Sequence, residues 1–218
     1  MKCLLITLFA VVQLGILGQF ESTKGLFSLG VRNTYGFFGS STEGVSAGVG
    51  GQFRIQFTDQ INTEWYADYI SYSNNVSSRM DYHVGWSVMY YVLPESGPVN
   101  LFQPFIEAGH CFDYTQVSVF GAYTESGKIE SLERWSSAVQ VGLGTHVNFT
   151  ERFDLSLKTQ YMIHLGSDLH TSEIVDGHAG HEHKSVFGVE KSKGTSLEGH
   201  LLLTLSANYK IVNLWGRK

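Results

Sequence analysis

The residues of this chain best suited to chemistry are histidines gathered near its C-terminal end. The four in one polar segment are His170, His178, His181 and His183. Carboxylates are interspersed among them, and imidazole with carboxylate suits zinc or copper. In an extended segment, side chains two residues apart face the same side, so His181 and His183 would point together. The spacing matches no strong metal signature, and solvated histidines are the alternative. We therefore keep a zinc or copper site here as a hypothesis and expect no other cofactor.

A serine and a histidine also lie close together in the sequence. His164 and Ser167 are three residues apart, which places them on opposite faces of a regular strand. A nucleophile and its base need hydrogen-bond reach. This pair therefore gives no support for hydrolytic catalysis, and we expect no enzyme activity.

Charged residues form a third group, because they recur at alternate positions of extended segments. Arg54 and Lys158 share this alternation with four carboxylates, Glu64, Asp68, Glu107 and Glu198. Buried charges need partners, so a structural ion-pair network is the main expectation if these side chains share one interior. A gated cation path is the alternative, favoured by the acidic excess.

The first residues resemble a secretory signal peptide. Lys2 supplies a short positive start, residues 3–17 are almost wholly apolar, and Gly18 offers a small residue for cleavage. An uncleaved anchor is the alternative. We predict a signal peptide over residues 1–18 and a single domain over residues 19–218. The mature domain then keeps only Cys111, which cannot form an internal disulfide and is interpreted as a packing residue.

The positions of all these groups depend on a period-two alternation of apolar and polar residues along the chain. It predicts eight strands, near residues 25–35, 45–57, 61–72, 80–92, 101–115, 135–147, 153–165 and 197–209. No Asp, Glu, Lys or Arg falls on the apolar side of any segment. The formal net charge is -5 and charged residues make up 16% of the chain, which gives no reason to expect nucleic-acid binding.

Three features indicate that the apolar side faces outward, toward lipid. The segments are long enough for tilted strands to cross a bilayer. The polar side mixes Gly, Ser and Gln with charges of both signs, which suits a narrow lumen. Short connections (58–60, 93–100 and 148–152) alternate with connections that include two long ones (116–134 and 166–195), as in transmembrane barrels. A soluble, lipocalin-like barrel with an apolar cavity is the alternative.

Aromatic residues lie where two interfacial belts are expected. Those near the predicted loop ends are Tyr35, Tyr69, Tyr82 and Tyr114, and those near the turn ends are Phe57, Tyr90, Phe102, Phe153 and Tyr209. Two residues fit the pattern less well. Pro104 lies inside a strand, near its start, where a missing ladder bond is tolerated. His110 lies on the lipid side, and Gly109 would mark a bulge that rotates it inward.

The pattern resembles the small outer-membrane β-barrel family that includes OmpA-type and OmpX-type domains. The resemblance spans residues 25–209, and its most specific stretch is Gln103-Pro104-Phe105-Ile106-Glu107-Ala108-Gly109. It implies an all-β, antiparallel, up-and-down eight-stranded transmembrane barrel, monomeric in the outer membrane and with a lumen filled by side chains. Some similar barrels modify lipid A, but the His-x-Ser-Asn pattern of the deacylases is absent.

The expected function is therefore that of an integral outer-membrane protein with a structural or surface-interaction role. Outer-membrane lipid is the expected partner, and the long loops would carry any further specificity. A metal-binding His-rich loop and a lipid A-modifying enzyme are the alternatives.

Overall fold

The structure is a computed structural model of the 218-residue chain. It describes residues 23–37, 44–93, 101–166, 169–174, 186–191 and 199–216. The predicted signal peptide lies outside these residues. Within them, no helix is long and apolar enough to cross a membrane.

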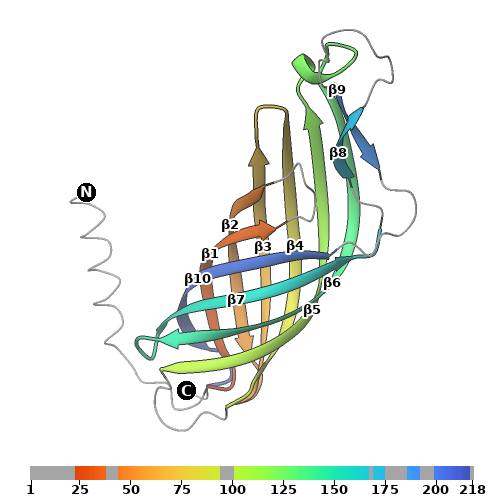
Figure 1. Ribbon diagram of the computed structural model, residues 1–218. Helices are drawn as coiled ribbons and strands as arrows, with labels where there is room; N and C mark the ends of the chain where they lie inside the picture. The colour runs from red at the N-terminus through yellow and green to blue at the C-terminus, as the bar shows by residue number, and fades with distance from the viewer. Residues whose placement is uncertain are drawn as a thin grey trace, which may run out of the picture.

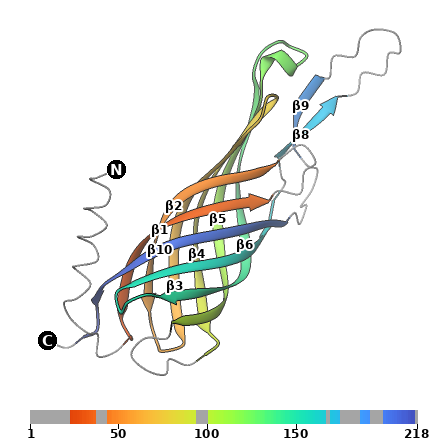
Figure 2. The ribbon, with the colours of Figure 1, turned by 60° about the vertical axis from the view of Figure 1, so that its left-hand side comes forward.

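Eight strands form one closed wall (Figures 1 and 2). They are β1 (Leu26–Phe37), β2 (Val45–Gln56), β3 (Ile61–Ser73), β4 (Ser77–Tyr91), β5 (Phe102–Val119), β6 (Glu130–Asn148), β7 (Phe153–His164) and β10 (Gly199–Asn213). The order around the barrel is β1-β10-β7-β6-β5-β4-β3-β2, and every neighbouring pair is antiparallel. Pairing of β1 with β10 closes the ring, so the backbone groups of each strand find partners inside the protein. The predicted fold is confirmed.

The burial of side chains follows the predicted alternation with the polar side inward. In β3 the lumen receives Asn62, Glu64, Tyr66 and Asp68, all buried, while Trp65 between them is 45% exposed. Apolar residues such as Val31 (69% exposed) and Leu143 (65% exposed) point outward. A soluble barrel would reverse these faces. The lipocalin-like alternative is therefore excluded, because the interior is charged and the exterior is apolar.

Aromatic side chains form the predicted belt near the loop ends of the strands. Tyr69, Tyr82, Tyr114 and Trp135, on β3 to β6, form a continuous row with ring centroids 5.0, 6.1 and 5.0 Å apart. Near the other end, the rings of Phe57 and Trp215 are 5.6 Å apart. Such amphipathic rings favour the headgroup level of a bilayer.

Two threonines shape the short turns at one end of the barrel, which we call the turn end. The Thr58 hydroxyl accepts hydrogen bonds from the backbone N–H groups of Gln60 (3.2 Å) and Ile61 (2.9 Å). The Thr150 hydroxyl accepts from those of Arg152 (3.2 Å) and Phe153 (2.9 Å). Hydroxyl side chains satisfy turn backbone in this way. The opposite end is the loop end.

The two long loops predicted at the loop end contain more regular structure than expected. Strand β5 continues to Val119, and β6 already begins at Glu130. Much of the predicted 116–134 loop is therefore a hairpin, with the short 3₁₀ helix η1 (Gly121–Tyr123) at its tip. In the 166–195 segment, β8 (Leu169–Ile174) pairs with β9 (Val186–Lys191). Figure 1 shows η1 and the β8–β9 pair at the loop end. Both loop predictions were wrong in extent.

Of the two irregular positions in β5, one behaves as predicted. Pro104 lies at the turn end, just beyond the last residue paired with β4. His110 does not turn inward, because the pairing of β5 with β4 and β6 runs through Gly109 without a shift. The predicted bulge was wrong. His110 stays on the outer side, and its ring packs against Phe112 with centroids 4.7 Å apart.

Candidate functional site

The lumen is the richest site of the chain, and it is organised in layers along the barrel axis. From the turn end upward they are a turn-end tier of charges, a central tier, an apolar cluster and a loop-end tier. Five cationic and six carboxylate side chains are buried among the described residues. They are Arg32, Arg54, Arg79, Arg134 and Lys158, with Glu64, Asp68, Asp81, Glu107, Asp113 and Asp154.

The central tier joins two cations to three carboxylates. Lys158 bonds to Glu64, and its Nζ lies 3.4 Å from Oε2 of Glu107. Arg32 places Nη1 3.2 Å from Oε1 of Glu64 and Nε 3.0 Å from Oδ1 of Asp68. The predicted pairing of Lys158 with Glu64 and Glu107 is therefore confirmed, with Arg32 as the second cation.

An aromatic ring packs against the central tier. The guanidinium carbon of Arg32 lies 4.1 Å from the centroid of Tyr66, within the range of a cation–π contact. The Tyr66 hydroxyl donates to Oε1 of Gln140 at 2.6 Å. Gln140 in turn donates to the Ser87 hydroxyl at 2.8 Å. These contacts span the lumen from wall to wall and leave little room between the strands.

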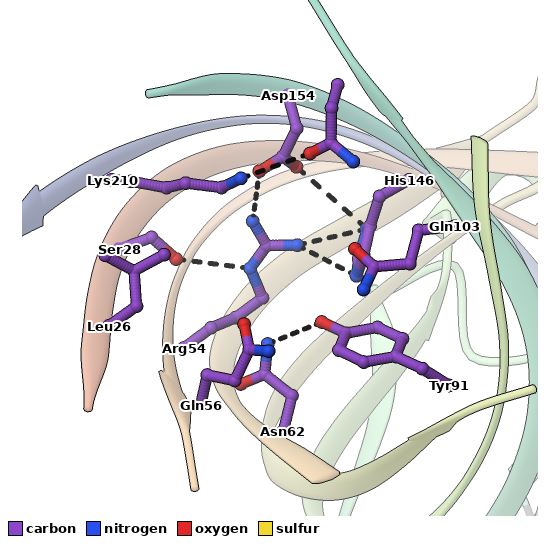
Figure 3. A pocket seen from close by; sticks show the side chains of 11 residues that line it. Leu26, Ser28, Arg54, Gln56, Asn62, Tyr91, Gln103, His146, Asp154 and Lys210 are labelled. Carbon is purple, nitrogen blue, oxygen red and sulfur yellow. Dashed lines mark hydrogen bonds and ion pairs between the residues drawn. The ribbon is translucent and has the colours of Figure 1, made fainter. Parts of the chain in front are cut away.

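The turn-end tier is built around Arg54 (Figure 3). Its Nη2 lies 2.5 Å from Oδ2 of Asp154, and its Nε donates to the Ser28 hydroxyl at 3.2 Å. Its Nη1 lies 3.0 and 3.1 Å from the two ring nitrogens of His146. The carboxylate predicted for Arg54 was wrong: Asp154 takes that place, and Glu198 lies outside the described residues.

An apolar cluster lies between the central tier and the loop-end tier on five of the eight strands, while on β4 the buried His83 stands between Asp68 and Asp113 in the strand pairing. The cluster consists of Ile70, Cys111, Ala138, Met162 and Leu202, all fully or almost fully buried. On each of these five strands, the apolar residue stands between a lumen residue of the central region and one nearer the loop end. Cys111 is a buried free thiol in this cluster, as its interpretation as a packing residue requires.

In the loop-end tier, two histidines and a carboxylate contact one another in a row. Nδ1 of His164 lies 3.3 Å from Oδ1 of Asp113, and its Nε2 lies 3.0 Å from Nδ1 of His200. Nη2 of Arg134 lies 3.4 Å from Oδ2 of Asp113. Both nitrogens of His164 therefore have neighbours inside the lumen. Ser167, which the sequence analysis considered as a nucleophile beside His164, lies outside the described residues.

Arg79 connects this tier to the β8–β9 pair. Its Nε lies 3.0 Å from Oδ2 of Asp81, and its Nη1 donates to the backbone carbonyl of Leu169 at 3.1 Å. Leu169 is fully buried. The start of β8 thus packs against the loop end of the barrel wall, next to Arg79.

The predicted metal site falls mostly outside the described residues. Only His170 is described; it lies in β8, and its Nε2 is 3.9 Å from Oε2 of Glu190 across the pair. The described ranges contain no group of three metal-ligating side chains. The hypothesis for His178, His181 and His183 stays a prediction, to be checked by zinc or copper binding after their replacement with Ala.

Sequence reasoning missed several lumen residues that the same alternation would have found. His83 and His146 lie on the polar side of predicted strands, and both are buried in the lumen. Arg79 and Arg134 each lie one residue outside a predicted strand, so they were assigned to connections. Extending the period-two count past those ends was the available signal.

Comparison with known proteins identifies the fold of the chain. No protein-family model and no curated protein sequence matches the chain. Among solved structures, it is similar to Ail, the attachment invasion locus protein of Yersinia pestis (11% identity, TM-score 0.52, covering 86% of this chain and 99% of Ail). It is also similar to a major outer membrane protein from Thermus thermophilus (11% identity, TM-score 0.53, covering 85% of this chain and 99% of that protein).

The chain has the fold of the small eight-stranded outer-membrane β-barrels. Its exposed apolar wall, bounded by aromatic residues, supplies the physical reason for that location, because such a surface is stable only against lipid. The barrel therefore lies in an outer membrane, in contact with its lipid. The short turns at its turn end correspond to the periplasmic side of such barrels.

Proposed function

We propose that this chain is a non-enzymatic, monomeric outer-membrane scaffold that keeps its lumen closed and displays the β5–β6 hairpin as an interaction surface. The closed lumen is the observation that carries the proposal. Two tiers of paired charges, an apolar cluster and a third tier of paired charges follow one another along the axis. An open path for ions would need a continuous polar, wet passage, which the apolar cluster opposes.

The β5–β6 hairpin supports the display part of the proposal. Strand β6 pairs with β7 only from Ala138, whereas it pairs with β5 up to Glu130. The hairpin therefore stands beyond β7 at the loop end, while on its other side β4 pairs with β5 as far as Val119 (Figures 1 and 2). Ile129 is 68% exposed and Leu132 is 42% exposed near its tip. Apolar side chains exposed on a protruding element favour contact with another molecule.

Two measurements test the proposal. Reconstituted barrel in a planar bilayer should give no steady conductance above background. In intact cells, trypsin should cut at the exposed Lys128 in the tip of the hairpin, while the barrel strands stay protected. A Lys128→Gln variant is the matched control and should resist that cut. Stable channels would overturn the closed scaffold, and a hairpin cut only after cell lysis would overturn the display.

A further inference from the structure

Strand β6 has an open edge at the loop end of the barrel. On one side β5 accompanies it as far as Glu130, whereas on the other side β7 ends opposite Ala138. The chain that follows β7 adds one backbone hydrogen bond, from the Leu165 N–H to the Ser137 carbonyl. Over Glu130–Ser136, no described residue pairs with β6 on the side that β7 has left. We call this stretch the β6 edge.

The alternation of the backbone determines which groups of the β6 edge are open. In an antiparallel strand, the N–H and C=O groups of one residue point to one side, and those of the next residue point to the other. The Ser137 carbonyl points away from β5, and the pairing of β6 with β5 continues beyond it without a shift. Ser131, Glu133 and Trp135 therefore direct their N–H and C=O groups to the open side.

The described neighbours of the hairpin do not cover the β6 edge. The β8–β9 pair contacts both β5 and β6, and it packs on the inner face of the hairpin, where Val117 and Val119 are buried. On the outer face, the Tyr114 hydroxyl donates to Oε2 of Glu133 at 2.5 Å, which draws that side chain toward β5. Trp135 is 79% exposed. The backbone groups of the edge are therefore accessible to another strand.

The β6 edge lacks the usual protection of an open strand and carries a negative charge. Proteins commonly protect such edges with proline, an outward lysine or a bulge. The sequence of Glu130–Ser136 contains no proline or lysine, and its pairing has no bulge. Its basic residue, Arg134, points into the lumen and lies 3.4 Å from Asp113. The outer face of the edge is left with the carboxylate of Glu133.

This charge disfavours a second copy of the chain as the partner. Glu133 is the middle one of the three residues whose backbone groups are open. Two copies that paired antiparallel along all three residues would place the two Glu133 side chains directly opposite each other. Like charges at directly opposite positions destabilise a strand pair, and a basic residue at that position stabilises it.

We propose that the β6 edge binds an extended, basic segment of another protein by adding it as a strand. Hydrogen bonds to the three open residues supply affinity, as in other cases of strand addition. Glu133 selects Lys or Arg at the position opposite to it, and Trp135, two residues along the same face, selects an apolar side chain. The inference rests on the proposed display of the hairpin and names the class of partner that the display serves.

Blocked heptapeptides test the pairing on the folded barrel in lipid nanodiscs. One has the sequence Ser-Val-Thr-Lys-Thr-Val-Ser, and the other has Glu in place of Lys. NMR follows amide hydrogen exchange along β6. The Lys peptide should slow exchange at Ser131, Glu133 and Trp135 in a saturable manner. It should leave Leu132 and Arg134 unchanged, because their N–H groups point to β5. The Glu peptide should bind at least about fivefold more weakly.

Methylation of the peptide backbone separates strand pairing from charge attraction. With Lys opposite Glu133, the Lys and the two Val residues of the peptide direct their N–H groups to β6, and the two Thr residues direct theirs away. N-methylation of the Lys and Val amides should abolish the protection, whereas N-methylation of the Thr amides should preserve it. The two methylated peptides carry the same charge, so equal binding of both would overturn the proposal.

Protein variants test the role of the carboxylate. Glu133→Gln should weaken binding of the Lys peptide about two- to fivefold, and Glu133→Lys should make the Glu peptide the tighter ligand. Asp59→Asn removes a carboxylate from an exposed position at the turn end and should leave binding unchanged. Heat-dependent gel mobility verifies that each variant is folded. An equal loss in Asp59→Asn and Glu133→Gln would overturn the selection by charge.

The protein without peptide supplies the remaining outcomes. Exchange at Ser131, Glu133 and Trp135 should be fast and independent of protein concentration. Slow exchange at all concentrations would mean that the edge is already paired within the chain, and exchange that slows with concentration would assign the edge to a second copy. Either result would overturn the proposal. Trypsin cleavage at Lys128 in intact cells, combined with no peptide binding, would reject this pairing and leave the proposed display standing.

Discussion

Lys158 is the residue whose removal should cost the barrel most, because it compensates two buried carboxylates. Its ammonium contacts Glu64 and Glu107 in the central tier. Lys158→Met leaves Arg32 as the remaining cation for Glu64 and leaves Glu107 without the one it had. Breaking a buried pair by removing one partner typically costs about 3–5 kcal/mol. We expect a loss of that size in the free energy of unfolding, measured by urea titration with tryptophan fluorescence.

The control for this prediction is an ion pair at the surface. Lys24 and Asp59 are 3.5 Å apart, and both side chains are more than half exposed. Exposed pairs contribute less than about 1 kcal/mol, so Lys24→Met should barely move the urea midpoint. Equal effects of the two substitutions would show that the central tier is not a stabilising network.

Two adjacent glycines on β2 should differ in how much stability they lose on replacement by alanine. A Cβ at Gly50 would clash with Oδ1 of Asp68 and with the backbone oxygen of Ala67. A Cβ at Gly51 would meet only the Gly30 oxygen, at 3.8 Å. Gly50→Ala must displace the carboxylate that pairs with Arg32 and should cost about 1–3 kcal/mol. Gly51→Ala should change stability by less than about 0.5 kcal/mol. Parallel urea titrations decide, and similar losses would contradict the crowding.

At this scale the sequence predicted which side chains enter the lumen but not all of their partners. Alternation alone places Arg54 and Lys158 inside. Which carboxylate each one meets depends on the heights of strands on the far side of the barrel. Arg54 on β2 reaches Asp154 on β7, and no feature of either sequence segment specifies that the two lie at the same level.

Among the elements, the β8–β9 pair should depend on one arginine of the barrel wall. The Nη1 atom of Arg79 donates to the carbonyl of Leu169, the first residue of β8. A hydrogen bond to a charged group contributes about 1.5–3 kcal/mol, so its loss should speed local opening about ten- to a hundredfold. We expect Arg79→Met to accelerate amide hydrogen exchange across Leu169–Ile174 by that factor and to leave β1 and β2 unchanged.

The matched control uses a cation at the same end of the barrel. Lys128 is exposed in the tip of the β5–β6 hairpin, and Lys128→Met should leave the exchange of β8 as it was. If both substitutions accelerated exchange in β8 equally, the protection of β8 would not depend on Arg79.

The elements that sequence reasoning missed all lie at the loop end, for a physical reason. Where a strand crosses lipid, one face must be apolar and the other polar, so the alternation is strong. Beyond the aromatic row, both faces of the hairpin meet water or protein. Gln116, Ser118 and Ser131 can then occupy the outer face, and the apolar contrast disappears although the strand continues. Pairing between strands, which single-segment patterns do not report, maintains the structure there.

For the whole molecule, closure and orientation were predictable because the membrane imposes them. An even number of strands, an uncharged outer side and short turns at one end already define an up-and-down barrel. The layered arrangement of the lumen is seen only in the folded barrel, because it depends on all eight strands together. The apolar cluster uses one residue from each of five strands, so no single segment indicates it.

Whether the outer wall of the barrel faces lipid is tested by placing an arginine at two different heights on that wall. Val141 lies on the outer face of β6, inside the span bounded by the aromatic residues, and Val212 lies on β10 near the turn end; they are 57% and 44% exposed. Arginine on a lipid-facing strand costs about 2–4 kcal/mol at the bilayer midplane and about 0–1 kcal/mol near the interface. Val141→Arg should therefore destabilise the barrel in lipid vesicles by that larger amount, and Val212→Arg should be nearly neutral. Unfolding free energies and the boiled-versus-unboiled gel shift report both. In water, an outward arginine at either site would be harmless, so equal stability of the two variants would mean that this wall does not face lipid.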